Sequence, residues 1–153
     1  YAKMYGDGFY TRAGGFRYVY AYATAGGTDR AYLYDSAGDD RFVGTSTYAK
    51  MYGDGFYNRA GGFRYAYAFA TAGGIDRAYL YDSAGDDRFL GTSTYAKMYG
   101  DGFYNRAGGF RYAYGYATAG GNDRAYFFDS AGDDTFRAAG ASARLEYAAA
   151  YVA

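Results

Sequence analysis

The chain has 153 residues, with 16 basic and 16 acidic side chains and no His, Cys, Pro or Trp. This balance gives no reason to expect nucleic acid or an anionic membrane as a partner. The missing Cys and His exclude a disulfide framework and a thiolate metal site, and they remove the commonest general base. The sequence has no run of about 18 apolar residues, so we predict no membrane-spanning segment.

The chain begins with short alternating segments that are typical of β-strands. Residues 1–5 (YAKMY) alternate Tyr and Lys with Ala and Met, and residues 16–24 (FRYVYAYAT) continue the period of two. Residues 31–35 form another predicted strand, which ends at the turn 36–40 (SAGDD) before a further strand starts at Arg41. Glycine and aspartate separate these segments, because both residue types favour turns.

The whole pattern recurs with a period of 47 residues, giving repeats 1–47, 48–94 and 95–141. A period of this size indicates a solenoid, a propeller or an array. A propeller is the main alternative, but three blades are too few to close a ring. We predict an all-β fold, a parallel β-helix (β-solenoid) with about two coils per repeat, as a single domain over residues 1–153. Tyr1 lies inside the repeat pattern, so we expect the sequence to be a piece of a longer or processed chain.

The C-terminal segment, at about residues 137–153, is a degenerate copy of the repeat. Residues 143–153 fit an alternating strand, and they also fit a helix with Ser142 as its N-cap. We favour the strand, and we expect the segment to differ because terminal repeats of solenoids often cap the stack.

Tyrosines recur at the same positions of successive repeats. Translation by one repeat would place such residues about 9.6 Å apart, with rings about 4.8 Å apart where the intervening coil also supplies an aromatic. We predict that the ladder consists of the positions that are Tyr in all three repeats: Tyr1, Tyr48 and Tyr95; Tyr5, Tyr52 and Tyr99; Tyr10, Tyr57 and Tyr104; Tyr18, Tyr65 and Tyr112; Tyr20, Tyr67 and Tyr114; and Tyr32, Tyr79 and Tyr126.

The alternation predicts which way most of these rings point. In residues 48–52 the tyrosines share a face with Lys50, which is almost never buried unpaired, so this face should meet solvent. In residues 78–82, Leu80 should point inward and its tyrosine neighbours outward. The orientation of residues 63–69 stays open, because a straight strand buries the rings whereas a bend after Arg64 exposes them.

Tandem Tyr-rich units that carry YDSAGDD (residues 81–87) resemble the bacterial parallel β-helix repeats whose stacked rings are called tyrosine ladders. The resemblance extends to about Phe136. It implies a β-helix, an extracellular or cell-surface location, and electron or hole movement along the ladder as a candidate role. The near-identity of the repeats also resembles a consensus-engineered or recently duplicated array.

The turn at residues 35–42 partly matches the calcium-binding nonapeptide GGxGxDxUx. Gly38, Asp40 and Phe42 match, but Asp35 and Ser36 replace the two leading glycines. Bound calcium is the alternative to our interpretation that these aspartates form turns by accepting backbone N–H groups. We predict no metal site.

Repetition also argues against an enzyme. An active site is usually one arrangement of unlike residues, whereas almost every polar residue here has two near copies and Glu146 is the only Glu. We predict a structural repeat module that presents stacked tyrosines, with no catalytic residue and no cofactor. The alternatives are tyrosine-mediated electron or hole transport and an aromatic face that binds polysaccharide. The expected partners are end-to-end copies, joined through open strand edges, or polysaccharide, and neither nucleic acid nor a membrane.

Overall fold

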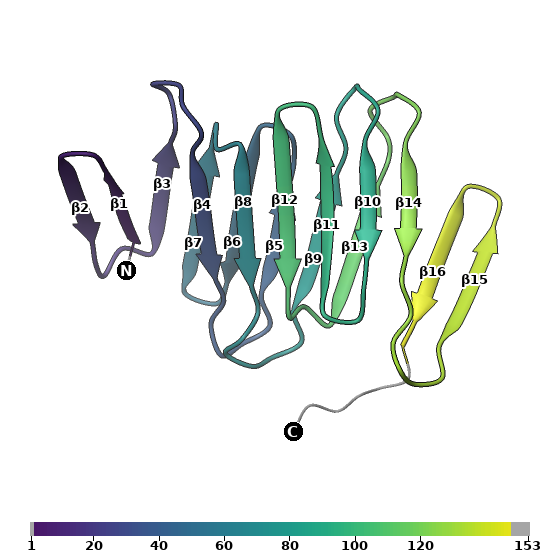
Figure 1. Cartoon of the computed structure of the whole chain (residues 1–153). Helices are drawn as coiled ribbons and strands as arrows, with labels where there is room; N and C mark the ends of the chain where they lie inside the picture. Colours follow the sequence, from purple (N-terminus) through teal and green to yellow (C-terminus); the bar gives the residue numbers. More distant parts are fainter. Residues whose placement is uncertain (1, 148–153) are drawn as a thin grey trace.

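The computed structural model describes residues 2–147, which contain strands and turns but no helix. In this part of the chain no helix is long and apolar enough to cross a membrane. The strands stack into successive coils, so the predicted β-solenoid is confirmed (Figure 1).

Two six-stranded sheets face each other and form the body of the solenoid. The first sheet contains, in spatial order, β3 (Tyr18–Tyr22), β7 (Phe56–Gly61), β6 (Tyr48–Gly53), β5 (Arg41–Gly44), β9 (Arg77–Tyr81) and β13 (Tyr112–Tyr116). The second sheet contains β4 (Arg30–Tyr34), β8 (Tyr65–Phe69), β12 (Phe103–Gly108), β11 (Tyr95–Gly100), β10 (Arg88–Gly91) and β14 (Arg124–Phe127).

Each repeat passes between the two sheets three times, from β3 to β4, from β4 to β5 and from β7 to β8. A repeat therefore makes about one and a half turns, where the sequence predicted about two. Because the number of crossings is odd, equivalent strands of successive repeats lie in opposite sheets. The strands β5, β6 and β7 belong to the first sheet, whereas their equivalents β10, β11 and β12 belong to the second.

Strands of successive coils pair in parallel, whereas strands that are consecutive in the sequence and lie in one sheet pair antiparallel. β8, for example, pairs in parallel with β4 on one side and with β12 on the other. The strands β5, β6 and β7 instead form an antiparallel meander, as do β10, β11 and β12. These meanders add antiparallel ladders to the parallel ones that the predicted β-helix implies. Their physical cause is the two-residue turn Asp54–Gly55, with Gly55 at a φ of 79°, which closes a hairpin between β6 and β7.

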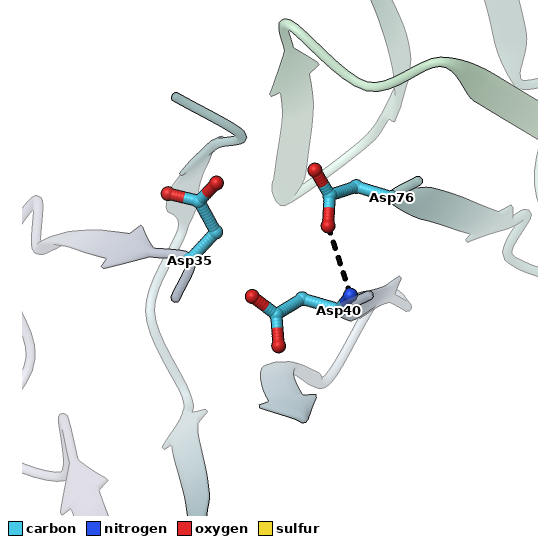
Figure 2. Close-up of side chains that lie close together, drawn as sticks. All are labelled: Asp35, Asp40 and Asp76. Carbon is cyan, nitrogen blue, oxygen red and sulfur yellow. Dashed lines mark hydrogen bonds between the residues drawn. The ribbon is translucent and has the colours of Figure 1, made fainter. Parts of the chain in front are cut away.

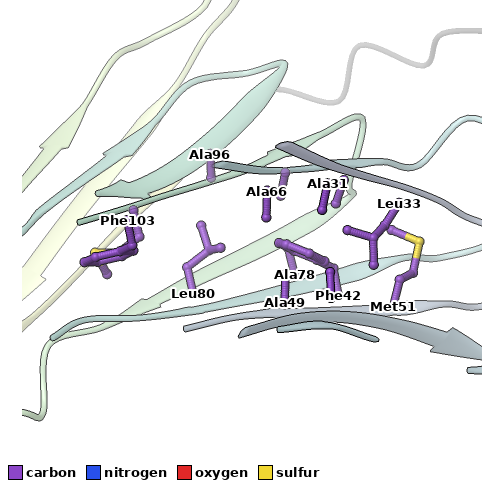
Figure 3. Packing of buried hydrophobic residues seen from close by; sticks show 14 of the residues in the cluster. Ala31, Leu33, Phe42, Ala49, Met51, Ala66, Ala78, Leu80, Ala96 and Phe103 are labelled. Carbon is purple, nitrogen blue, oxygen red and sulfur yellow. The ribbon is translucent and has the colours of Figure 1, made fainter. Parts of the chain in front are cut away.

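The core between the sheets combines many alanines with a few large apolar side chains (Figure 3). Ala49, Met51 and Leu80 are buried, as the alternation predicted, and Lys50 lies on the opposite face of its strand. Small residues let the sheets approach closely. In one such place Asn105 lies against Gly44, and its Nδ2 donates a hydrogen bond to the carbonyl oxygen of Thr45 across 2.9 Å.

A bend of the backbone before β8 decides the orientation of residues 63–69, which the alternation left open. Gly62 has a φ of 77°, and its backbone packs against the carbonyl group of Ala23 in the preceding coil. β8 then begins at Tyr65, so its two alanines are buried and its rings face outward. Because of this bend, Ala66 and Ala68 point inward although they share the parity of the exposed Arg64.

A two-stranded hairpin lies beyond each end of the two sheets (Figure 1). The N-terminal hairpin pairs β1 (Ala2–Gly6) with β2 (Phe9–Ala13), and the C-terminal one pairs β15 (Thr135–Ala139) with β16 (Ser142–Glu146). The strand predicted in the C-terminal segment is confirmed for Ser142–Glu146. The rest of that prediction, at residues 148–153, lies outside the described residues.

Candidate functional site

The predicted ladder tyrosines of the two sheets lie on the outer faces. In β4 the burial alternates strictly, so that Ala31 and Leu33 are buried whereas Tyr32 and Tyr34 are more than half exposed, at 52% and 59%. The same alternation holds in β8, which lies beside β4. The outer faces therefore present aromatic rings to solvent. Tyr1 lies outside the described residues.

Tyrosine rings that touch between parallel strands are 35, 37 or 39 residues apart in sequence, and those within a hairpin are five apart. Tyr32 stacks on Tyr67 with centroids 5.3 Å apart and an interplanar angle of 14°, while Tyr65 contacts Tyr104 at 5.8 Å. The prediction that tyrosines 47 residues apart lie in one column is wrong. Equivalent residues such as Tyr48 and Tyr95 lie in opposite sheets, because each repeat crosses the solenoid an odd number of times.

Ring contacts form continuous chains over part of each sheet. On the second sheet, Tyr32, Tyr67, Tyr104 and Tyr99 follow one another across β4, β8, β12 and β11, with centroid distances of 5.3, 5.8 and 6.1 Å. On the first sheet the ring contacts join the strands β3, β7 and β6, and separately β9 and β13: Tyr18, Tyr20 and Tyr52 all contact Tyr57, Tyr79 contacts Tyr114, and Tyr81 contacts Tyr116.

The ladder is interrupted at the same strand of each meander. The outward residues of β5 are Arg41 and Val43, and those of β10 are Arg88 and Leu90. Several predicted ladder residues have no ring partner among residues 2–147, namely Tyr5, Tyr10, Tyr48, Tyr95, Tyr112 and Tyr126. The structure therefore divides the predicted ladder into segments.

Tyr104 is the ring with the most aromatic neighbours in the longest chain. It contacts Tyr65, Tyr67 and Tyr99. Desolvation raises the pKa of its phenol, and the nearby Tyr67 raises it further, while the Arg106 guanidinium acts in the opposite direction. The phenol of Tyr104 therefore keeps its proton to a higher pH than an exposed tyrosine.

Basic side chains cover ring faces that aromatic neighbours leave open. The guanidinium of Arg59 lies 4.6 Å from the Tyr48 ring centroid, and that of Arg106 lies 4.4 Å from the Tyr95 centroid. The ammonium of Lys97 lies 4.9 Å from the Tyr99 centroid. These distances fall within the range of cation–π attraction. The predicted ladder is thus an array of tyrosines and cations.

The balanced charge of the sequence conceals an uneven distribution of charge, because the two six-stranded sheets carry no acidic side chain. All fifteen aspartates lie in turns and loops, outside the strands. The two six-stranded sheets carry nine basic side chains and no acidic one: Arg41, Lys50, Arg59 and Arg77 on the first, and Arg30, Arg88, Lys97, Arg106 and Arg124 on the second. Net charge alone could not reveal this distribution.

The aspartates join each turn to a turn 36 or 37 residues later. Asp35 accepts hydrogen bonds from the backbone N–H groups of Thr71 and Ala72, at 2.7 and 2.8 Å. Asp39 accepts one from Ile75, and the backbone N–H of Asp40 donates to Asp76, both at 2.8 Å. The structure thus agrees with the interpretation that these aspartates form turns, and it adds that they connect successive coils.

Two groups of three carboxylates nevertheless come together at these turns. Asp35, Asp40 and Asp76 form one group, and Asp82, Asp87 and Asp123 form the other, each with oxygens within 4.8 Å of one another. Figure 2 shows Asp76 directing one oxygen at the backbone nitrogen of Asp40. Desolvation is the main cause that raises the pKa of Asp76, and the neighbouring carboxylates add to it. Such oxygens are suitable calcium ligands, but here they already accept N–H and hydroxyl groups.

Buried carboxylates at these turns require glycine on the neighbouring strand. Asp40 and Asp87 are each only 1% exposed. A Cβ atom on Gly53 or Gly100 would overlap their Oδ1 atoms, so these two positions admit no side chain without a rearrangement. Oδ1 of Asp87 is buried and accepts no hydrogen bond in the described structure.

No family model, no curated protein and no solved structure matches this chain.

Proposed function

We propose that this chain is a structural module, a stiff solenoid whose repeats stack end to end and present tyrosines, rather than an enzyme. The observation that carries the proposal is the continuity of the stack. β8 of the second repeat pairs with β4 of the first and with β12 of the third, so one sheet unites all three repeats. One apolar core extends through the same region, from Ala31 to Ala107.

The same arrangement supports a rod that can be extended. Two repeats add five strands to each sheet, because successive repeats alternate between the sheets. At a strand spacing of about 4.8 Å, each added repeat should lengthen the rod by about 12 Å. Inserting a second copy of residues 48–94 should therefore increase the length by this amount in small-angle scattering and raise the unfolding midpoint. A compact particle of unchanged length would contradict the proposal.

The outermost strands of the sheets leave backbone groups free for a further repeat or a second copy. The N–H groups of Arg124 and Phe128 bond to the β10 side, so alternation turns the N–H of Ala125 toward the open edge of β14. We expect concentration-dependent end-to-end association in analytical ultracentrifugation. Ala125→Pro should abolish it, because proline removes this edge donor and keeps the bonds to β10. A wild-type chain that stays monomeric at millimolar concentration would contradict this expectation.

Hole transport along the tyrosines is the second candidate, and the chain from Tyr32 to Tyr99 favours it. Four rings follow one another at 5.3 to 6.1 Å across four strands. Oxidation of a tyrosine requires loss of the phenol proton, and the raised pKa of Tyr104 makes its proton harder to remove.

The test of this second candidate is photo-oxidation of the folded protein. Tyrosyl radicals generated at one end of this row of rings, Tyr32 or Tyr99, should spread to the other end. Tyr104→Phe should stop this spread, because phenylalanine keeps the ring and lacks the phenol. Tyr114→Phe, on the opposite sheet, is the matched control. Equal radical spread in both variants would contradict transport through Tyr104.

A further inference from the structure

Each outer face carries a line of cations across four adjacent strands. On the first sheet the line is formed by Arg59 on β7, Lys50 on β6, Arg41 on β5 and Arg77 on β9. On the second sheet the equivalent line is formed by Arg106 on β12, Lys97 on β11, Arg88 on β10 and Arg124 on β14. Neighbouring strands are about 4.8 Å apart, and each line consists of two facing pairs that are offset by two residues, because Lys50 lies opposite Val43 and Lys97 opposite Leu90.

The register places several of these cations directly opposite one another. Lys50 faces Arg59, and Arg41 faces Arg77. Like charges in directly opposite positions destabilise a sheet. Among the described residues, none of the cations in the two lines forms an ion pair with a carboxylate. Ring contacts stabilise Lys50 and Arg59, but they supply no negative charge between the facing cations.

The C-terminal hairpin shows what such a pair of cations attracts. Arg137 and Arg144 face each other across β15 and β16, like the pairs in the sheets. Here the chain supplies its own carboxylate, since Glu146 lies 4.0 Å from Arg137 and 3.1 Å from Arg144. The pairs in the two sheets have the same geometry of facing cations and no such carboxylate.

We propose that the two outer faces bind an anionic polysaccharide along these lines, with its carboxylate or sulfate groups between the facing cations. An acidic polymer supplies repeated charges to a repeated array, and the tyrosine hydroxyls beside the lines can donate hydrogen bonds to it. The aspartates are kept to the turns, so the faces themselves do not repel the polymer.

Nucleic acid fits these faces less well. Proteins that hold single strands stack bases on open aromatic faces, whereas many rings here are stacked on one another, as Tyr79 is on Tyr114, or are covered by a cation. A flat sheet face also offers no element that enters a groove of duplex DNA.

The test measures binding of the 153-residue chain to polygalacturonate, heparin, dextran and a single-stranded dT30 oligonucleotide by titration calorimetry. We expect binding to at least one acidic polysaccharide, which weakens as salt is added and raises the melting temperature, and no binding to neutral dextran. Polygalacturonate carries carboxylates alone, whereas heparin carries sulfates as well, so tighter binding to heparin would indicate a contribution from sulfate. Tighter binding to dT30 than to either acidic polysaccharide would overturn the proposal, as would the absence of binding at low salt.

Charge-matched variants test the lines themselves. The line variant replaces two cations on each face: Lys50→Gln, Arg59→Gln, Lys97→Gln and Arg106→Gln. The control removes the same number of charges elsewhere: Lys3→Gln, Arg17→Gln, Arg64→Gln and Arg111→Gln. The line variant should lose about tenfold or more in affinity and the control less than about threefold, because only the line variant removes facing cations from the two six-stranded sheets.

A conservative variant guards against a failure to fold. Lys50→Arg with Lys97→Arg keeps every charge, so its affinity should stay within about threefold of the wild type. Equal losses in the line variant and the control would show that net charge alone attracts the polymer, and this result would overturn the proposal.

Discussion

The N-terminal hairpin and the first meander share a sequence and differ in burial. Residues 2–6 and 49–53 both read AKMYG, and each segment forms a strand that pairs with the strand after it. Yet Met4 is 36% exposed, whereas Met51 is fully buried at 0%. The second copy has β5 on its other side and the second sheet opposite its apolar face. The hairpin is thus a local property of the sequence, while the core is supplied by other repeats.

The largest expected effect comes from removing the methionine in each copy. Met51→Ala should lower the free energy of unfolding by about 2–5 kcal/mol, because it leaves a cavity in a closed core. Met4→Ala should lower it by less than about 1 kcal/mol, because Met4 is partly in water. Urea unfolding of both variants measures the difference. Similar losses in the two variants would show that the N-terminal hairpin is docked as tightly as the meander.

A smaller difference in stability is expected between substitutions of Gly6 and Gly100, which end the equivalent strands β1 and β11. Gly100→Ala should destabilise the protein by about 1–3 kcal/mol, because the new methyl group overlaps the buried carboxylate of Asp87. Gly6→Ala meets only the exposed ring of Phe9, which can rotate away. Thermal unfolding should therefore show a clear shift for the first variant and a slight one for the second. A reversed order would mean that Asp87 moves aside without loss.

Alternation was sufficient to predict the strands and most of the core. It placed Ala49, Met51 and Leu80 inside because Lys and the tyrosines on the other parity favour solvent. It left the strand after Arg64 undecided, because a bend changes which residues point inward and an alternating pattern does not show where the chain bends. The Asp-Gly pair at 54–55, a strong hairpin signal, could have revealed the meander and the facing pair of Lys50 and Arg59.

The assignment of repeats to sheets could not be predicted from the period. A repeat of 47 residues is compatible with any number of crossings, and only an odd number separates equivalent tyrosines onto opposite faces. For the same reason the facing pair of Arg41 and Arg77, which depends on a parallel ladder 36 residues apart, became visible only in the structure.

The acidic turns give a third comparison, between the protonated and the ionised form of one buried carboxyl group, that of Asp76. Burial raises the pKa of Asp76, and the carboxylates of the preceding turn add to the effect. A carboxyl with a raised pKa in the folded state favours folding while it is protonated, and it loses this contribution as the pH rises through that pKa. Asp76→Asn keeps an oxygen that can accept the N–H of Asp40 and has no charge to bury.

The stability of Asp76→Asn relative to the wild type should therefore increase as the pH rises above about 4 and level off at higher pH. Urea midpoints of the variant and the wild type between pH 3 and pH 7 measure this difference. A difference in stability that stays constant over this range would show that Asp76 loses no folding contribution when it ionises.

The smallest expected effect separates the ring of a tyrosine from its hydroxyl. Tyr48 forms no hydrogen bond through its phenol in the described structure, and its ring lies beneath the guanidinium of Arg59. Tyr48→Phe keeps that ring and should change the free energy of unfolding by less than about 0.5 kcal/mol. Tyr48→Ala removes the ring and should lower it by about 1 kcal/mol or more, because the cation–π contact and the buried ring surface are lost together. The chain already carries Phe69 and Phe128 at positions where other repeats have Tyr. If chemical unfolding shows that Tyr48→Phe is as damaging as Tyr48→Ala, the hydroxyls rather than the rings stabilise the outer faces.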